Sequence, residues 1–304
     1  MKKVVLFTSS QIAWNLVYYL IETKRLSAVI VTSNNHPQFV QMINFLQQSN
    51  IPVFQHPDKI KDDFLKLMES LNPSLALCFS YSKIFTKEII EVFKDRIFNI
   101  HPSSLPKYKG PNPLYWQIRD GVDKGAISIH KITQDIDNGD IAYRFDFDIK
   151  KESTLGALGN KVSILIPSVV HEFLLEFENS RLNYLKQEDS KYYHNPKDLD
   201  FMIDWKKDTS FEIIQKVKAS NPIYGGVQTS IKNNSIKILE CTSVDKQTYG
   251  VKEGVVVLID ENEGLVVSCR DGAIKLNIIS TIDGIFSGYS YANFIKIFSG
   301  EKFI

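Results

Sequence analysis

The sequence predicts an α/β protein in which a mostly parallel, doubly wound sheet is followed by a small β-barrel. From residue 3 to about residue 149, short apolar runs alternate with helix-like segments, which is the pattern of a parallel sheet with crossover helices. After residue 226 the chain shows alternating, strand-like segments instead. They are separated by Asn233-Asn234, Glu263-Gly264 and Asp271-Gly272, which are signals of hairpin turns.

Each element of the sheet domain is predicted from its hydrophobic pattern and from the turn residues beside it. The predicted strands are Val4–Ser9, Ala28–Thr32, Leu75–Ser80, Ile97–His101, Ala126–Ile132 and Ile141–Ile149. The predicted helices are Gln11–Glu22, Gln38–Gln48, Asp62–Leu71, Lys87–Phe93, Asn112–Asp120 and Leu155–Glu178. The turn after the first strand, Thr8-Ser9-Ser10-Gln11, lacks the G-x-G-x-x-G of a dinucleotide site, so the architecture is Rossmann-like without a sign of NAD binding.

The chain of 304 residues is long enough for about two domains. Between Leu185 and Asp204 the apolar period breaks down into polar, proline-containing sequence, which is typical of a connection between domains. We therefore predict a sheet domain over residues 1–185, a linker over 186–204 and a β domain over 205–304. In the last of these, Thr209 and Glu212 have capping-box spacing at the start of a helix predicted over Phe211–Ala219.

The composition is that of an ordinary soluble protein: 43% of the residues are hydrophobic, 23% are charged, and the formal net charge is +1. These values exclude a disordered chain and a protein that coats nucleic acid. No run of 18 or more apolar residues occurs, and no cleavage-site pattern follows Met1-Lys2-Lys3. We expect no signal peptide, no membrane partner and a cytoplasmic location.

The cysteines and histidines do not indicate a metal site. Cys78, Cys241 and Cys269 lie far apart in apolar, strand-like sequence, which predicts buried reduced thiols. Five of the histidines are scattered along the chain at His36, His56, His130, His171 and His194. Because no cluster has the spacing of metal ligands, no metal is expected.

A candidate active site begins at the strand Ile97–His101. Side chains alternate along a strand, so Asn99 and His101 share one face. Pro102, Pro106 and Gly110 then turn the chain just past the strand. Ligands bind at such carboxyl ends of strands in α/β sheets, so the two side chains are candidates for chemistry. An N-x-H pair on a strand can equally be a polar pair with a structural role only.

Asp137 lies 36 residues after His101, beyond a predicted helix and a predicted strand. This distance fits a helical crossover that returns the chain to the neighbouring strand, which would place the Asp137 carboxylate beside the imidazole. An amide that donates hydrogen bonds, an imidazole that titrates near neutrality and a carboxylate would then converge.

The segment N-x-H-x-S-x-L-P-x-Y-x-G, followed by D-x-G-D, resembles the signature of the N10-formyltetrahydrofolate-dependent formyltransferases. Ile203-Asp204-Trp205 and Asn221-Pro222 resemble landmarks of their carboxyl-terminal domain, which is OB-like. Ser104 departs from the commoner leucine. The resemblance implies the catalytic set Asn99, His101 and Asp137. The residues that match the signature are Asn99, His101, Ser103, Leu105, Pro106, Tyr108, Gly110, Asp137, Gly139 and Asp140.

The implied reaction transfers a formyl group from N10-formyltetrahydrofolate, the co-substrate, to a primary amine. Asn99 Nδ2 and protonated His101 are expected to stabilise the developing oxyanion. Asp137 is expected to raise the pKa of His101 above about 6.5. It can also receive the proton of the amine, directly or through water, and the sequence does not determine which group is the base. The resemblance assigns the folate to two loops, mainly through backbone contacts, at Phe79, Ser80, Tyr81 and Ser82 and at Ile136, Gly139 and Asp140. Phe79 and Tyr81 can equally serve only to pack the strand end.

The acceptor amine is predicted from charge and from a second resemblance. A tRNA-binding enzyme needs phosphate contacts, yet residues 26–58 contain no Lys or Arg, and residues 204–304 contain 12 basic and 12 acidic residues. A predicted substrate-binding set, which resembles that of amino-sugar formyltransferases, comprises Ser103, Lys107, Tyr108, Lys109 and Gly110. These observations favour a nucleotide-linked amino sugar as the acceptor. Methionyl-tRNA, hydrolysis of the formyl folate and folate binding without turnover remain alternatives, and the resemblance makes a homodimer an expectation.

Overall fold

The computed structural model describes residues 2–304, which form two compact units. Unit 1 comprises residues 2–113, Lys124–Asp148 and Gly159–Tyr193. Unit 2 comprises Leu114–Asp123, Ile149–Leu158 and His194–Ile304. Two short segments, Leu114–Asp123 and Ile149–Leu158, therefore belong to unit 2 although they lie within the range predicted for the sheet domain, and no sequence signal indicated this.

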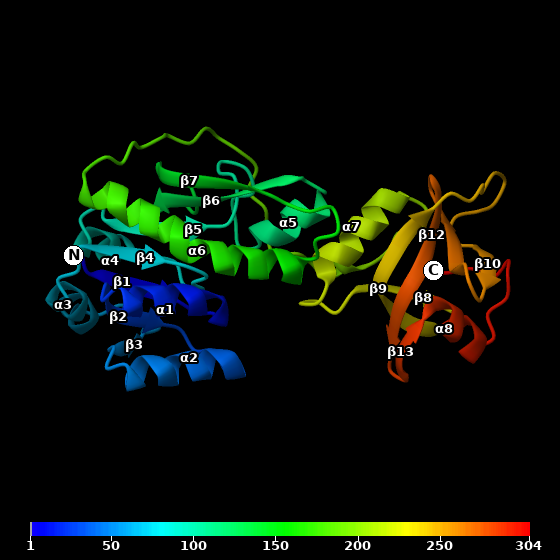
Figure 1. The fold of residues 1–304 in the computed structure, drawn as a ribbon, viewed down its shortest axis with the longest axis horizontal. Helices are drawn as coiled ribbons and strands as arrows, with labels where there is room; N and C mark the ends of the chain where they lie inside the picture. The colour runs from blue at the N-terminus through cyan, green and yellow to red at the C-terminus, as the bar shows by residue number, and fades with distance from the viewer. Residues whose placement is uncertain (1) are drawn as a thin grey trace. The chain divides into compact units, whose positions relative to one another are not determined.

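Unit 1 is built on a seven-stranded sheet with the strand order β3-β2-β1-β4-β5-β6-β7 (Figure 1). Strands β1 to β5 are parallel, which confirms the mostly parallel, Rossmann-like sheet. The short edge strand β3 was not predicted, because three residues carry too little pattern. The strands are β1 Val4–Thr8, β2 Leu26–Val31, β3 Val53–Gln55, β4 Leu75–Cys78, β5 Ile97–His101, β6 Lys124–Lys131 and β7 Ile141–Asp148.

The predicted crossover from β5 to a parallel neighbour is wrong. Strand β6 pairs with β5 in the antiparallel sense, and β7 pairs with β6 in the same way. The helix between β5 and β6, α5 (Pro113–Arg119), has only seven residues and is therefore about 10 Å long. Helix length does not decide the direction, because α4 (Lys87–Val92) has only six residues and connects the parallel strands β4 and β5.

Helices cover both faces of this sheet. Phe64 of α3 and Ile89 of α4 belong to the core cluster that contains Val5 and Phe7 of β1. On the other face, Phe98 of β5 packs against Phe173 of α6, with ring centroids 5.1 Å apart. The remaining helices are α1 Trp14–Glu22, preceded by the 3₁₀ turn η1 Gln11–Ala13, then α2 Pro37–Gln48, α3 Asp62–Ser70, α4 Lys87–Val92 and α6 Leu155–Glu178.

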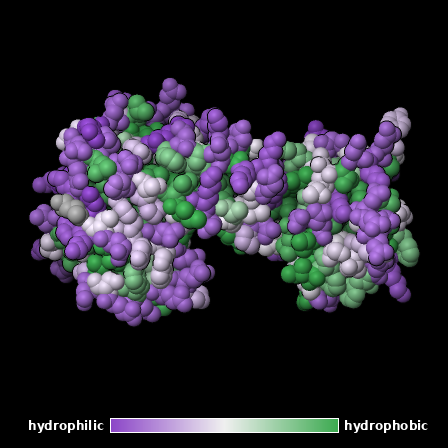
Figure 2. Space-filling model, viewed as in Figure 1, coloured by the Kyte–Doolittle hydropathy of each residue, from purple (hydrophilic) through white to green (hydrophobic). Residues whose placement is uncertain are grey.

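Among the described residues, α6 is the one helix whose length and composition would allow it to cross a membrane. Its apolar residues have another explanation, because Val162, Ile166 and Phe173 are fully buried, or nearly so, within the core of unit 1. Hydrophilic side chains cover most of the face of unit 1 seen in Figure 2. The apolar character of α6 is therefore that of a helix packed on a sheet.

Unit 2 contains an antiparallel sheet with the order β10-β11-β12-β9-β8, and β13 pairs with β12. The three predicted hairpin turns separate β8 from β9, β10 from β11 and β11 from β12. The predicted capping box is confirmed, since Glu212 N donates to Thr209 Oγ1 (3.2 Å) and Thr209 N donates to Glu212 Oε2 (2.8 Å). The elements are η2 Asp198–Phe201, α7 Ser210–Ser220, β8 Val227–Ile231, β9 Asn234–Val244, β10 Val256–Asp260, β11 Gly264–Cys269, β12 Gly272–Thr281, β13 Gly284–Ser287 and α8 Gly288–Phe294.

Residues 301–304 close this sheet into a barrel. On one side, Ser230 of β8 exchanges two backbone hydrogen bonds with Ile304, of 3.0 and 2.8 Å. On the other side, Val256 N donates to the carbonyl of Glu301 and Phe303 N donates to the carbonyl of Gly254, both at 2.8 Å. The Phe303 ring is fully buried. The two edge strands are therefore joined through the last residues of the sequence, as the predicted small β-barrel requires.

The three cysteines are buried and are not bonded to one another, as predicted. Cys78 lies on β4 of unit 1, and Cys241 and Cys269 lie on β9 and β11 of unit 2. Burial raises the pKa of the Cys241 thiol to about 12, so this thiol stays protonated and unreactive at neutral pH.

Candidate active site

The three side chains predicted to form the site lie together in unit 1. Asn99 and His101 project from the same face of β5, and both approach one oxygen of Asp137. Asn99 Nδ2 donates to Asp137 Oδ1 at 3.2 Å, and His101 Nδ1 lies 3.6 Å from the same oxygen. The His101 ring is 4% exposed. The polar groups are therefore largely removed from water, where electrostatic interactions are stronger.

The backbone around Asp137 is constrained in two ways. Asp137 has a φ of +52°, the left-handed conformation that non-glycine residues seldom adopt. At Gly139 a Cβ atom would lie 2.0 Å from the carbonyl oxygen of Lys131, so only glycine fits there. The backbone N–H of Gly110, in the segment that follows β5, donates to Asp137 Oδ2 at 2.8 Å. Both carboxylate oxygens thus have defined partners.

The hydrogen bond of His101 Nε2 determines which ring nitrogen carries the proton. Nε2 lies 2.9 Å from the carbonyl oxygen of Tyr108. A carbonyl can only accept a hydrogen bond, so Nε2 carries a hydrogen and donates it. In the neutral ring Nδ1 is then unprotonated, and it faces Asp137. A proton taken up by His101 would therefore reside on Nδ1, beside the carboxylate.

His130 is a fourth member of the site that the sequence did not reveal. It lies on β6 directly opposite Asn99, with Nε2 3.2 Å from Asn99 Nδ2 and 3.4 Å from Asp137 Oδ1. Its Nδ1 lies 2.8 Å from the carbonyl oxygen of Lys131, which makes Nε2 of the neutral ring an acceptor. The antiparallel pairing of β5 and β6 creates this contact. The only sequence signal for His130 was a polar residue in the strand that follows the N-x-H strand. The antiparallel pairing of the two strands, which brings His130 to Asn99, could not be predicted from sequence.

The expected increase in the pKa of His101 is not observed. Burial lowers its pKa below the ordinary value, and this effect exceeds the opposing effect of Asp137. For Asp137, burial opposes the charged form, but in the acidic range where this carboxyl titrates, positive charge on the His101 and His130 rings and the N–H of Gly110 hold its pKa well below the usual range. At neutral pH the site therefore combines an ionised Asp137 with a neutral His101.

The first loop predicted to bind folate follows β4, the strand that pairs with β5. The Phe79 side chain is 2% exposed, and the Tyr81 ring packs 5.5 Å from that of Phe7. Both aromatic rings therefore contribute to the core. Ser80, with a φ of +51°, and Ser82 are exposed. The Ser80 carbonyl accepts from Ser9 N at 2.9 Å, and the Ser82 N–H donates to Ser9 Oγ at 3.1 Å, so part of the loop backbone is already bound within unit 1.

The second predicted folate loop connects β6 to β7. The Ile136 side chain is 48% exposed, next to the buried carboxylate of Asp137. Gly139 is buried, and the carbonyl of Asp140 accepts a hydrogen bond from Lys131 N at 3.0 Å. Ile136 is therefore an apolar surface that a ligand could cover beside the carboxylate.

The five predicted acceptor-binding residues differ in what they present to solvent. Lys107 is exposed, whereas Lys109 is 5% exposed and its Nζ donates to Asn138 Oδ1 at 2.7 Å. Ser103 is fully buried, and its Oγ donates to the carbonyl of Lys107 at 2.8 Å. Tyr108, which is 8% exposed, and Gly110 shape the loop through φ angles of +60° and +116°. Among these five, Lys107 alone has an exposed charged side chain.

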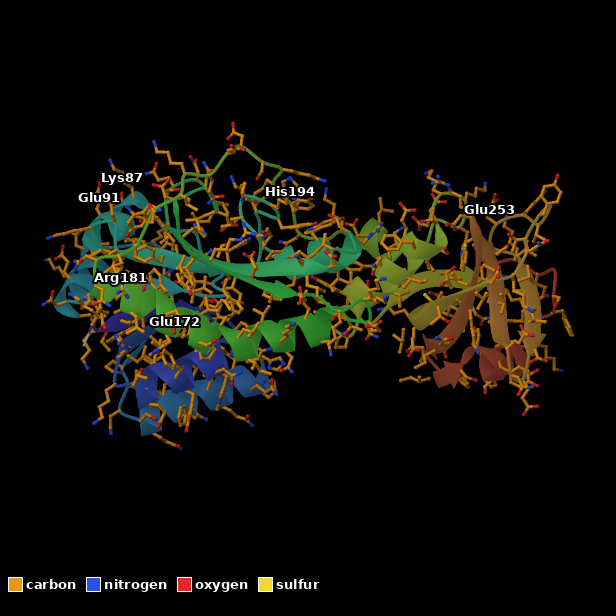
Figure 3. All side chains as sticks on the ribbon, turned by 45° about the horizontal axis from the view of Figure 1, so that its top comes forward. Lys87, Glu91, Glu172, Arg181, His194 and Glu253 are labelled. Atoms are coloured by element: carbon orange, nitrogen blue, oxygen red, sulfur yellow. The ribbon has the colours of Figure 1, made fainter. Side chains whose placement is uncertain are left out.

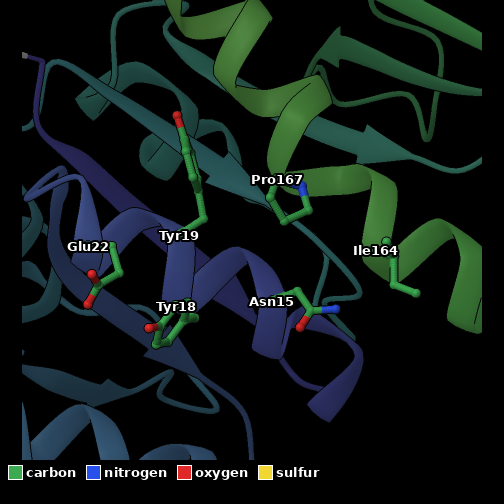
Figure 4. Close-up of a pocket in the computed structure, with 6 residues that line it drawn as sticks. All are labelled: Asn15, Tyr18, Tyr19, Glu22, Ile164 and Pro167. Atoms are coloured by element: carbon green, nitrogen blue, oxygen red, sulfur yellow. The ribbon is translucent and has the colours of Figure 1, made fainter.

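A separate hollow of about 400 Å³ lies between α1 and α6 of unit 1 (Figure 4). It shares no residue with the group around Asp137. Its lining residues are Asn15, Tyr18, Tyr19, Glu22, Ile164 and Pro167. Across residues 2–304 no group of three or more His, Cys, Asp or Glu side chains is placed to hold a metal ion.

Comparison with known proteins identifies related sequences over both units. Residues 2–173 match the family described as formyl transferase, and residues 197–286 match the formyl transferase C-terminal domain. Methionyl-tRNA formyltransferase of Prochlorococcus marinus (strain MIT 9515) is 29% identical over 253 residues, which are 76% of this chain and 76% of that protein.

Two solved structures share the fold. WlaRD, a sugar 3N-formyl transferase crystallised in the presence of dTDP and 5-N-formyl-THF, has a TM-score of 0.67 and 23% identity, covering 90% of this chain and 96% of that one. The N-formyltransferase from Helicobacter canadensis, in complex with folinic acid and dTDP-3-aminofucose, has a TM-score of 0.67 and 21% identity, covering 94% of this chain and 100% of that one. At these identities the likeness is one of fold.

Proposed function

Since the chain belongs to the formyl transferase family, we propose that it moves the formyl group of N10-formyltetrahydrofolate to the amine of a nucleotide-linked amino sugar. Membership of the family, and with it formyl transfer from a tetrahydrofolate donor, confirms what the motif indicated. The acceptor and the roles of individual residues are the proposal.

One observation carries the assignment of the site. A single oxygen, Asp137 Oδ1, lies within 3.6 Å of Asn99, His101 and His130, while Gly110 N–H binds the other carboxylate oxygen. Formyl transfer needs hydrogen-bond donors for the charge that develops on the formyl oxygen and a base for the amine proton. This cluster contains both kinds of group.

Asn99 and His101 take different roles in the proposed mechanism. Asn99 Nδ2 has two hydrogens, directed at Asp137 and at His130. The hydrogen that faces His130 is the one that the formyl oxygen would take over as negative charge develops there, while the other stays on Asp137. His101 Nδ1 accepts the amine proton, because Nε2 is already protonated toward Tyr108. Asp137 then stabilises the imidazolium beside it.

The loops beside this cluster fit the folate donor. Cys78, at the end of β4, pairs with Asn99 of β5, so the loop that follows β4 starts next to Asn99. Ser80 and Ser82 are exposed there, although the Ser80 carbonyl already accepts from Ser9 N and the Ser82 N–H donates to Ser9 Oγ. Ile136 supplies an apolar surface beside Asp137. Backbone polar groups and an apolar wall are what a flat, polar-edged ring system needs for binding.

The charge distribution favours a small acceptor over tRNA. Residues 26–58, which include β2 and α2, contain no Lys or Arg, and residues 204–304 are neutral overall. Binding of a tRNA acceptor arm depends on neutralising several phosphates. The exposed Lys107 offers one positive charge, which suits a compact diphosphate better than a tRNA acceptor arm with several phosphates. Methionyl-tRNA remains the second candidate, because the curated relatives that match the chain carry that activity.

The acceptor can be identified by mass spectrometry. Purified protein and N10-formyltetrahydrofolate would be incubated separately with methionyl initiator tRNA and with a panel of amino-deoxysugar nucleotides. We expect a sugar nucleotide to gain a formyl group while the tRNA stays unmodified. Formylated methionyl-tRNA would refute the proposed acceptor and establish the second candidate. Formate release without a modified amine would indicate a hydrolase.

The protonation of His101 gives a further prediction. Because burial lowers its pKa, His101 is expected to titrate below about 6.5 in an NMR titration of the free protein. A base must be neutral to act, so its contribution to turnover is expected to be constant above this pH and to decline only as pH falls through the lowered pKa. In Asp137→Asn the midpoint should fall further, since the carboxylate raises it. A midpoint above 6.5 in the wild-type protein would contradict this picture. The spectrum of His101→Gln identifies the resonance.

A further inference from the structure

Residues 184–193 lie against the site, although most of them belong to the segment predicted as a linker. We call this segment the strap. It follows α6 shortly after Arg181 and ends before His194, both labelled in Figure 3. At its start, Leu185 exchanges two backbone hydrogen bonds with Ile141 of β7, at 2.8 and 2.9 Å. The start of the strap is therefore hydrogen-bonded to the sheet of unit 1.

Gln187 connects the strap to the loop that carries Asp137. Its Nε2 donates to the backbone carbonyl of Asp137 at 2.9 Å and to that of Gly139 at 2.7 Å. Only the amide nitrogen can face two carbonyl oxygens, so the orientation of the side chain is defined. Because Asp137 has a φ of +52°, its left-handed backbone needs support from its surroundings. Gln187 supplies two of the hydrogen bonds that hold it.

The other end of the strap reaches the same carboxylate through a second loop. Tyr193 N donates to the carbonyl of Lys109 at 2.8 Å, and Ser190 Oγ donates to that of Pro106. The residue after Lys109, Gly110, donates its N–H to Asp137 Oδ2. A Cβ atom on Gly110 would lie 2.0 Å from the carbonyl oxygen of Tyr193, so strap and loop are in direct contact. Both loops that determine the position of the carboxylate thus rest on one segment.

One polar atom of the Gln187 side chain lowers the stability of the folded protein. The Gln187 Oε1 is buried and has no hydrogen-bond partner among the residues that the structure describes. An unpaired buried carbonyl destabilises a folded protein, and a residue chosen for stability alone would avoid it. The presence of glutamine at residue 187 is better explained by the two hydrogen bonds that it donates to the carbonyls of Asp137 and Gly139.

We propose that the strap orients the Asp137 carboxylate for formyl transfer, with Gln187 as a positioning residue that acts through the backbone of Asp137 and Gly139. The inference rests on the proposed role of Asp137. Its physical basis is that displacement of a catalytic group by about 1 Å can lower the rate about 100-fold. Gln187 itself touches neither substrate in this scheme.

The test compares variants in a cycle with Asp137→Asn. Gln187→Met keeps the length of the side chain and removes both donors, and we expect kcat to fall about 10- to 100-fold while KM for each substrate changes less than about threefold. Gln187→Lys retains donors and is expected to restore most of kcat. The matched control is Glu188→Ala, an exposed neighbour, which should leave kcat unchanged. Adding Gln187→Met to Asp137→Asn should cause no further loss, because the two changes act through one group.

Two outcomes would overturn the inference while leaving the proposed function intact. One is wild-type kcat in Gln187→Met together with a large loss in Asp137→Asn. The other is a loss in the double variant that equals the product of the single losses, as expected for an independent structural role. A full rate in Asp137→Asn would instead refute the proposed site.

Hydrogen exchange gives a readout that does not depend on turnover. Peptides that cover residues 133–140 should exchange faster in Gln187→Met than in the wild type or in Glu188→Ala, because the loop has lost two restraints. Unchanged exchange in all three proteins would overturn the inference, whatever the acceptor proves to be.

Discussion

An Asp137→Asn variant is expected to lose about 1,000-fold in kcat while keeping its fold. The change removes the negative charge 3.6 Å from His101 Nδ1, so the imidazolium formed when His101 takes a proton loses its stabilising partner. It also disturbs the hydrogen bonds, because the amide nitrogen of the introduced asparagine would face either Asn99 Nδ2 or Gly110 N–H, both of which are donors. His101→Ala removes the base itself and is expected to have an effect of the same order.

Turnover would be measured with the acceptor that the wild-type protein formylates, and circular dichroism and Tm would establish that the variants are folded. Asp63→Asn is a suitable control, because it makes the same chemical change at an exposed position on α3. If either Asp137→Asn or His101→Ala retained nearly full turnover, the assignment of the site would be wrong. Loss of the folded state would contradict the expectation that these variants keep their fold.

Phe303→Ala is expected to lower the free energy of unfolding of unit 2 by about 3 to 5 kcal/mol. The Phe303 ring is fully buried and lies 5.6 Å from the ring of Trp205, so its removal leaves a cavity at the closure of the barrel. The backbone hydrogen bond from Phe303 to Gly254, which joins the closing segment to the edge near β10, is expected to weaken as well. Phe303→Ala is therefore expected to lower the free energy of unfolding more than removal of an exposed side chain in the same segment.

The measurement is urea denaturation of the full chain, followed by tryptophan fluorescence and circular dichroism. Ile304→Ala is the matched control: it lies next in the chain, and its side chain is 79% exposed while its backbone makes the hydrogen bonds to Ser230. It should change the free energy of unfolding by less than about 0.5 kcal/mol. Equal destabilisation by the two variants would show that Phe303 does not anchor the barrel.

Local patterns in the sequence were sufficient for much of this protein. The alternation of side chains along Ile97–His101 places Asn99 and His101 on one face, and the structure keeps them there. The capping box at Thr209 and the hairpin turns of unit 2 were also read correctly, because each depends on residues only a few positions apart. The formyltransferase signature is local in the same sense, since its residues lie in two short stretches of sequence, 99–110 and 137–140.

Contacts between distant residues were decided only by the tertiary structure. His130 reaches Asn99 across 31 positions because β6 is antiparallel to β5, and Gln187 reaches Asp137 across 50 positions through a backbone carbonyl. The net pKa of His101 likewise depends on burial by neighbours from several elements, which here exceeds the effect of Asp137. The sequence by itself determined which groups could perform the chemistry. Strand direction, backbone hydrogen bonds and desolvation decided how those groups are held, because these are properties of the packed chain and leave no pattern in residue type.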